Sequence, residues 1–307
     1  MLNRRILRTK AFKTLFSFSE DRSLSLKDSL SLLEISCEAT RDLYLFMLAC
    51  VNPLTEEAAR RIEAARSKFN PSEEERNPNM KFAGNAMAPI LAEDPDFQKL
   101  LERKKLSWEP YDVLVRNLFD SIREKDYFKA YMAAPGHSLK EDARLFKKIF
   151  ENEFEDNEEL AQILEEMNIY WIDDLGYVLR FDMKAMDEIA STGRWTYPDL
   201  YPDATDHVFV SKLVANAVAN YDRISADVAA NVSKWESDRL FNTDIALIVL
   251  GVTEAESFDD IPVRATINEY VELTKFYSTP KSRSFVNGLL DRLIRAEMEE
   301  GRITKRL

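Results

Sequence analysis

The sequence has 307 residues, enough for one to three domains, and its 45% hydrophobic and 31% charged residues are typical of a soluble globular protein. Its net charge of −12 argues against nucleic-acid binding by the chain as a whole. No apolar run approaches the ~20 residues needed to cross a bilayer, and no signal-peptide apolar block follows the basic N-terminus. We therefore expect a cytoplasmic protein without a membrane segment.

Glycine and cysteine usage narrows the fold class. Seven glycines are few for this length, and large β-proteins and doubly wound α/β enzymes need more of them in their turns, so the scarcity predicts helices. Cys37 and Cys50 are the only cysteines and have no metal-ligand spacing. We interpret them as buried, reduced thiols, with a single disulfide as the less favoured alternative.

The charge is distributed unevenly along the chain. Residues from Lys275 to the C-terminus hold eight basic and four acidic side chains, so the segment between the two ends is strongly acidic. Because charges beyond about 10 Å are largely screened at ordinary salt, binding depends on the local field at a surface. The first 13 residues hold five basic residues and no acid: Arg4, Arg5, Arg8, Lys10 and Lys13.

In chain order, the first predicted helix covers Arg4–Phe18. Its apolar stripe can dock on a core while a basic face meets solvent, although solvated cations on an ordinary amphipathic helix are the better interpretation of such a helix in isolation. The stripe has the spacing i, i+4, i+8 and i+11: Leu7, Ala11, Leu15 and Phe18.

The middle of the chain is predicted to form helices with acidic faces. Ser25–Cys50 predicts a helix that Pro53 stops, Thr55 opens the next one, and residues 70–80 form a polar connection. Trp195–Asp203, with two prolines, is interpreted as a linker. Four further predicted helices lie between: Asp96–Lys105, Pro110–Arg123, Lys140–Phe154 and Leu160–Met167.

The last hundred residues also predict helices. A proline-led helix runs from Pro262 to about Tyr277, after which we expect Thr279 as N-cap and Pro280 as first residue of the final helix. Asn287-Gly288 would ordinarily suggest a hairpin turn, but apolar pairs continue at helical spacing on both sides, so we expect Gly288 to let a neighbouring helix approach closely. Three helices precede Pro262: Asp206–Asn220, Tyr221–Trp235 and Ser237–Val252.

No enzyme signature is present. The sequence lacks GxGxxG, a Walker loop, GxSxG, HExxH and CxxC. His137 and His207 lie far apart in loop-like contexts and are interpreted as surface histidines. The acidic run at residues 151–159 is interpreted as a solvated helix end and not a metal site. We therefore expect no catalytic residue, no metal and no cofactor.

The turn at residues 277–285 combines features of an anion-binding site with aromatic rings. A helix N-terminus attracts anions, and Lys281 and Arg283 add cations within the first turn. Tyr277 and Phe285 supply flat faces on which unpaired bases could stack. The alternative is a capped helix with Phe285 in the core. The pattern is that of a single-stranded RNA site.

These residues resemble a known family. Ile261–Arg292 (IPVRATINEYVELTKFYSTPKSRSFVNGLLDR) is similar to the C-terminal signature of NusB, the bacterial transcription antitermination factor. Arg4-Arg5-x-x-Arg8, leading into Leu15–Phe18, resembles the arginine-rich first helix of that family. The close similarity covers about 50 residues, and a looser similarity covers about 120 when the helices before Ile261 are counted. Ordinary members are about half as long, so the chain resembles an enlarged member, of the Bacteroidetes type.

The resemblance implies an all-α protein of two helical subdomains with a large helical insertion. Residues 1–54 would begin the NusB-like fold, residues 55–204 would be the insertion, and residues 205–307 the C-terminal subdomain. It also implies binding of boxA-type single-stranded RNA with NusE, a small ribosomal subunit protein, and an indirect link to the RNA polymerase elongation complex. RNA contacts would fall on Arg4, Arg5, Arg8, Tyr277, Lys281, Ser282 and Phe285; the charge pattern adds Lys10, Lys13 and Arg283.

Two other functions are weighed against this one. Some RNA methyltransferases begin with a NusB-like domain, but here the signature is C-terminal and no glycine-rich cofactor domain follows it. The stronger rival is a helical protein-interaction or assembly scaffold whose RNA binding is incidental.

Overall fold

The computed structural model describes residues 1–232 and 241–305. Its regular secondary structure in these residues is helical, with no strand, which confirms the predicted all-α fold. No helix in the described part is long and apolar enough to cross a membrane. The chain divides into two compact units, one of Met1–Cys37 with Leu200–Leu307 and one of Glu38–Asp199. Cys37 and Cys50 are both buried and neither forms a disulfide, in agreement with the favoured interpretation.

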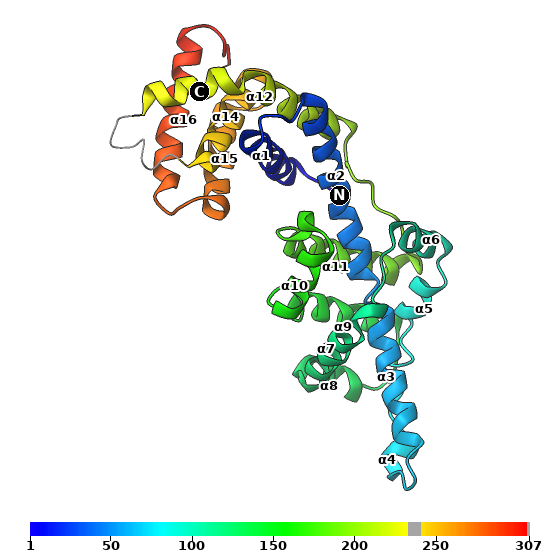
Figure 1. Cartoon of the computed structure of the whole chain (residues 1–307). Coiled ribbons are helices and arrows are strands. Elements are labelled where there is room, and N and C mark those ends of the chain that lie inside the picture. The colour runs from blue at the N-terminus through cyan, green and yellow to red at the C-terminus, as the bar shows by residue number, and fades with distance from the viewer. Residues whose placement is uncertain (233–240, 306–307) are drawn as a thin grey trace. The chain divides into compact units, whose positions relative to one another are not determined.

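The first unit is built around one buried helix. That helix is α14 (Asn242–Ser257), whose residues from Ala246 to Ala255 are all buried because four helices of the unit pack against it (Figure 1). The beginning of α2 (Leu26–Leu48) also belongs to this unit. The four packing helices are α1 (Arg4–Glu20), α12 (Ala204–Asn231), α15 (Val263–Tyr277) and α16 (Ser282–Glu299).

Helix α1 forms as its periodicity predicts. The Asn3 side chain caps it by accepting a hydrogen bond of 3.1 Å from the Ile6 N–H. The whole predicted stripe from Leu7 to Phe18 is buried. Arg8 and Lys10 are also buried, so the helix inserts more than its apolar stripe into the unit.

Two predictions about the end of the chain are wrong. Helix α16 begins at Ser282, with Lys281 as its N-cap residue; Thr279 does not cap it and instead shares a hydroxyl contact of 2.9 Å with Ser282. Gly288 faces open space. The close approach occurs at Gly251, where an added Cβ would lie 2.7 Å from Leu290 Cδ2.

Helix α12 differs from its prediction as well. The expected pair Asp206–Asn220 and Tyr221–Trp235 forms one continuous helix to Asn231, since nothing interrupts the backbone hydrogen bonding at the expected junction. Residues 233–235 of that prediction, and 237–240 of the predicted Ser237–Val252, lie outside the described residues.

The second unit packs short helices around aromatic side chains. Helix α11 packs against α9, and α3 packs against α7. Phe46 stacks on Trp108 and Trp171, with ring centroids 4.7 and 5.7 Å apart. Pro53 lies in the first turn of α3 and so does not stop a helix there. The elements are the rest of α2, α3 (Val51–Arg66), α4 (Glu73–Arg76), α5 (Met87–Ala92), α6 (Pro95–Lys104), η1 (Glu109–Tyr111), α7 (Asp112–Glu124), α8 (Asp126–Ala133), α9 (Leu139–Asn152), α10 (Glu158–Met167), η2 (Ile169–Trp171) and α11 (Leu175–Thr192).

Candidate nucleic-acid interface

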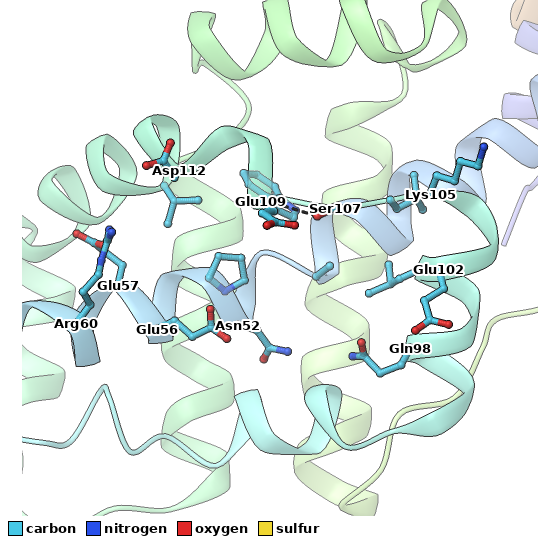
Figure 2. Close-up of a pocket in the computed structure, with 16 residues that line it drawn as sticks. Asn52, Glu56, Glu57, Arg60, Gln98, Glu102, Lys105, Ser107, Glu109 and Asp112 are labelled. Atoms are coloured by element: carbon cyan, nitrogen blue, oxygen red, sulfur yellow. Dashed lines mark hydrogen bonds and ion pairs between the residues drawn. The ribbon is translucent and has the colours of Figure 1, made fainter.

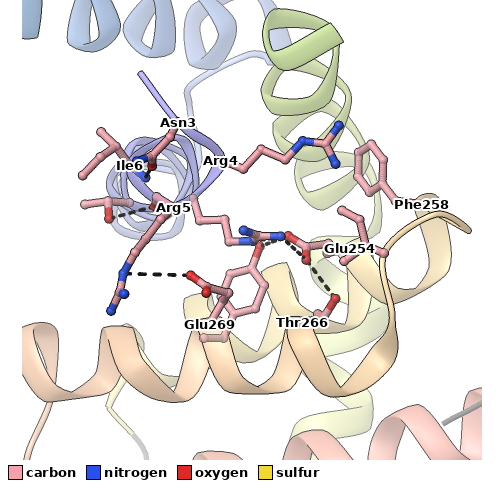
Figure 3. A network of polar contacts seen from close by, with 12 residues as sticks. Asn3, Arg4, Arg5, Ile6, Glu254, Phe258, Thr266 and Glu269 are labelled. Carbon is pink, nitrogen blue, oxygen red and sulfur yellow. Dashed lines mark hydrogen bonds and ion pairs between the residues drawn. The ribbon is translucent and has the colours of Figure 1, made fainter. Parts of the chain in front are cut away.

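Two side chains of α1 lie beside helix α15. The Arg5 guanidinium is 4.0 Å from the Glu269 carboxylate, and Figure 3 shows Arg5 leaving α1 toward that residue. Lys13 Nζ lies 6.0 Å from the centre of the Tyr277 ring. The same ring packs against Phe12, with centroids 4.8 Å apart. The structure therefore brings residues from the two ends of the chain together.

The end of α15 and the first turn of α16 add two more cations. Lys275 Nζ and the Arg283 guanidinium lie 2.6 and 3.5 Å from the two carboxylate oxygens of Glu272. The hydrogen bond from Lys275 lowers the pKa of Glu272, and the charges of Arg283 and Arg5 lower it further. Arg5 and Arg283 thus act on one carboxylate although 278 positions separate them in the sequence.

We call this surface the basic edge; it comprises Arg5, Lys13, Lys275, Tyr277 and Arg283. Its arginines are more than half exposed, and the Tyr277 ring is partly exposed. Lys281 and Phe285 lie nearby in the sequence, the first exposed and the second half-buried. Exposed cations beside an accessible ring can contact phosphates and stack a base.

Arg8 does not reach this surface. Its guanidinium donates two hydrogen bonds, of 2.7 and 2.8 Å, to the carboxylate of Glu254 on α14. Thr266 and Tyr270 on α15 donate to the same carboxylate. Arg8 is 6% exposed and Glu254 is fully buried. This network joins α1 to α14 and α15, so Arg8 connects helices of the first unit. Figure 3 shows Glu254 and Thr266 within it.

The remaining predicted residues lie elsewhere. Arg4 leaves α1 on another side from Arg5 and pairs with Asp206 and Asp260 at 3.3 and 3.4 Å (Figure 3). The Lys10 side chain is fully buried. Ser282 is buried too, and its hydroxyl donates a hydrogen bond of 2.9 Å to Asp244.

Two contributors were not among the predicted site residues. Lys275 follows Glu272 and Glu269 at three-residue steps on α15, a helical spacing that could have indicated a shared face. Asp244 accepts hydrogen bonds from Ser278 at 2.6 Å and from Ser282, which anchors the turn between α15 and α16 to the start of α14. Burial raises the pKa of Asp244 despite these bonds. No local pattern identifies Asp244, because its partners lie more than thirty residues later.

The described elements that carry these residues are all helices, and comparison with known proteins shows which family part of the chain is similar to. Residues 181–295 match the model of the NusB family. The chain is 40% identical over 82 residues to the transcription antitermination protein NusB of Listeria monocytogenes serotype 4b (strain CLIP80459), covering 27% of this chain and 64% of that relative. It is 29% identical over 119 residues to that of Natranaerobius thermophilus, covering 39% of this chain and 86% of the relative.

The chain is larger than these relatives. The match covers 64% of the length of the Listeria relative, which is less than two thirds, and only 27% of this chain. The NusB of Chloroherpeton thalassium is 34% identical over 93 residues, which are 30% of this chain and 44% of the relative. No solved structure matches the chain.

Proposed function

We propose that this protein is a cytoplasmic RNA-binding transcription antitermination factor and not an enzyme. It binds boxA-type single-stranded RNA together with NusE, supports transcription of ribosomal RNA operons, and meets the RNA polymerase elongation complex indirectly. The match of residues 181–295 to the NusB family and the relatives named transcription antitermination protein NusB support the general role. In this proposal residues 1–54 and 205–307 form the RNA-binding part, and residues 55–204 are a helical insertion.

The basic edge is the observation that carries the proposal. Arg5, Lys13 and Arg283 come from opposite ends of the sequence and gather around the Tyr277 ring and two glutamates of α15. Phosphates bind the cations and an unpaired base stacks on the ring. Lys281 and Phe285, exposed and half-buried, extend the contact along α16.

Glu269 and Glu272 set the conditions under which the edge binds RNA. Each carboxylate lies within 4.0 Å of a cation of the edge, so in the free protein the arginines already have anionic partners. Exposed pairs of this kind contribute only about 0–1 kcal/mol, so a phosphate can exchange for a carboxylate at small cost. The glutamates then hold the cations in place before RNA arrives.

The test is a titration of a fluorescent boxA-like RNA oligomer, with and without NusE, across a series of salt concentrations. If about five basic residues meet phosphates, log affinity falls with log salt at a slope of about −3.5. In the double variant Arg5→Ala/Arg283→Ala this slope should become shallower by about 1.4, because two phosphate contacts are lost. The matched control is Arg295→Ala, which removes an exposed arginine of α16 paired with Asp291 and should leave the slope unchanged.

The rival function is a helical scaffold for protein assembly with incidental RNA binding. The acidity of the second unit favours it, because Glu38–Asp199 holds 33 acidic and 22 basic residues, which accounts for −11 of the net charge of −12. A flat salt response, or no RNA binding when NusE is present, would support the scaffold over the antitermination factor.

A further inference from the structure

The second unit contains a large cleft outside the NusB-family residues. Its volume is about 850 Å³, and α3, α6, the segment before η1 and the start of α7 line it (Figure 2). Pockets of several hundred Å³ accept drug-sized ligands or a few side chains. All lining residues fall between Ala49 and Val115, within the one unit.

The cleft includes an apolar surface held in a fixed position. Trp108 is 4% exposed, its indole N–H donates a hydrogen bond of 2.6 Å to the Phe46 carbonyl, and its ring stacks on Phe46. Pro53, Leu101 and Leu106 continue the apolar lining. A partner's apolar side chain would therefore bury area mainly on the half-buried Pro53 and Leu101, above a Trp108 ring that is already fixed.

The polar lining is predominantly acidic, and part of its charge is uncompensated. Glu56, Glu102 and Glu109 are exposed and form no side-chain hydrogen bond or ion pair within residues 1–232 and 241–305. Glu57 differs, because Arg60 and Arg61 pair with it. Lys105 is the one lining cation without such a partner among the described residues, so the three free carboxylates leave a net negative charge that attracts a cationic ligand and repels RNA phosphates.

An unused hydrogen-bond acceptor also lines the cleft. The Asn52 side-chain oxygen is buried and has no hydrogen-bond partner among the described residues. Asn52 of α3 and Gln98 of α6 both line the cleft (Figure 2). A buried acceptor without a partner costs about 1–3 kcal/mol, so stability is recovered if the Asn52 side chain turns into the cleft and its oxygen accepts from a ligand N–H.

We propose that this cleft docks a basic amphipathic segment of a partner protein. An apolar side chain of the segment lies against Trp108 and Leu101, flanking lysines or arginines pair with Glu56, Glu102 and Glu109, and one N–H donates to Asn52. The complementarity of charge selects a cationic peptide over a nucleic acid, and the apolar surface selects an amphipathic peptide over a merely basic one.

Three synthetic 14-residue peptides test this proposal against the full chain at 0.15 M salt, by fluorescence anisotropy. The first has Leu at positions i, i+3, i+4 and i+7 and Lys at the others; the second replaces Lys by Glu; the third replaces Leu by Ser. We expect the first to bind, the second not to bind, and the third to bind at least about tenfold more weakly.

Matched charge reversals locate the site. Glu102→Lys/Glu109→Lys should weaken binding of the first peptide by about tenfold or more, because like charges then face each other. Glu165→Lys/Glu188→Lys makes the same change in net charge at exposed positions outside the cleft and should leave binding nearly unchanged. Circular dichroism and thermal melting confirm that both variants fold.

Four outcomes would overturn the proposal. They are no binding of the first peptide, equal weakening by both double variants, equal binding of the Leu and Ser peptides, and a self-association that only the Glu102/Glu109 variant abolishes. The last would identify the occupant as a second copy of this chain. Because no RNA is present in these assays, failure of the antitermination proposal would not affect their result.

Discussion

Tyr277, at the end of α15, lies against Phe12 of α1 with ring centroids 4.8 Å apart and planes inclined by 42°. The contact holds the tyrosine ring against the unit while the ring stays partly exposed. A ring held in this way can stack a base with little loss of side-chain entropy. The same contact links the basic first helix to the C-terminal turn.

Replacing Tyr277 tests this stacking role. We expect Tyr277→Ala to weaken RNA binding by about 1–3 kcal/mol, because a stacked base loses its platform. Tyr277→Phe keeps the ring and its packing on Phe12 and should bind within a few tenths of a kcal/mol of the original protein. Anisotropy titration with the boxA-like oligomer measures both. Equal affinity of the alanine variant and the unchanged protein would exclude stacking at this ring.

Replacing Arg8 should affect mainly stability, whereas replacing Arg5 should affect mainly RNA binding. Removing one partner of a buried ion pair costs about 3–5 kcal/mol, so Arg8→Ala should lower the free energy of unfolding by that amount because it leaves Glu254 without its cation. Arg5→Ala removes only an exposed pair and should change stability by less than about 1 kcal/mol while it weakens RNA binding. Urea unfolding monitored by circular dichroism measures stability. A stable Arg8→Ala variant would contradict this assignment.

Asp244 should control the turn that carries Lys281 and Arg283. Asp244→Ala leaves the Ser278 and Ser282 hydroxyls without their acceptor, at a cost of about 1–3 kcal/mol in stability. The turn then loses its attachment to α14, and RNA affinity should fall although Asp244 lies outside the basic edge. Asp244→Asn retains an acceptor oxygen, so its stability and RNA affinity should lie between those of the original protein and the alanine variant. If RNA affinity is unchanged in the alanine variant, the attachment has no part in binding.

Asp182 predicts a dependence of stability on pH. It is fully buried in the second unit, and neither carboxylate oxygen has a hydrogen-bond partner among the described residues. Burial raises its pKa well above the ordinary value of about 3.9, so the folded state holds the proton more tightly than the unfolded chain. Below about pH 4 the Asp182 carboxyl is protonated in both states, and stability has its full value. As pH rises toward the raised pKa, only the unfolded chain loses the proton, so the free energy of unfolding falls by up to about 1.4 kcal/mol per pH unit.

In the variant Asp182→Asn the side chain at position 182 cannot ionise, so this group causes no fall in the free energy of unfolding as pH rises. Its free energy of unfolding relative to the original protein should therefore increase steadily between about pH 4 and the raised pKa, as urea unfolding at several pH values would show. Asp187→Asn, at an exposed position of the same helix paired with Lys147, should not show this increase. A difference between Asp182→Asn and the original protein that does not vary with pH would refute the prediction.

Much of the helical structure could be predicted because helix periodicity is local. The stripe of α1 and the position of α15 followed from residues three and four apart, and both are confirmed. Helix α11 was not predicted, although its buried residues from Leu175 to Ile189 also have helical spacing. Asp182 lies in the middle of that stripe, and a buried carboxyl interrupts the apolar pattern by which such helices are found.

The sequence by itself determined the helical class, the two basic ends and the resemblance of the C-terminal segment to its family, since these depend on composition and short spacings. Only the tertiary structure decided which arginine of α1 faces solvent. Arg5 and Arg8 are three residues apart on one helix, but the carboxylate that draws Arg8 inward belongs to Glu254, 246 positions later. The burial of a charge depends on what the fold places opposite it, and no local pattern contains that information.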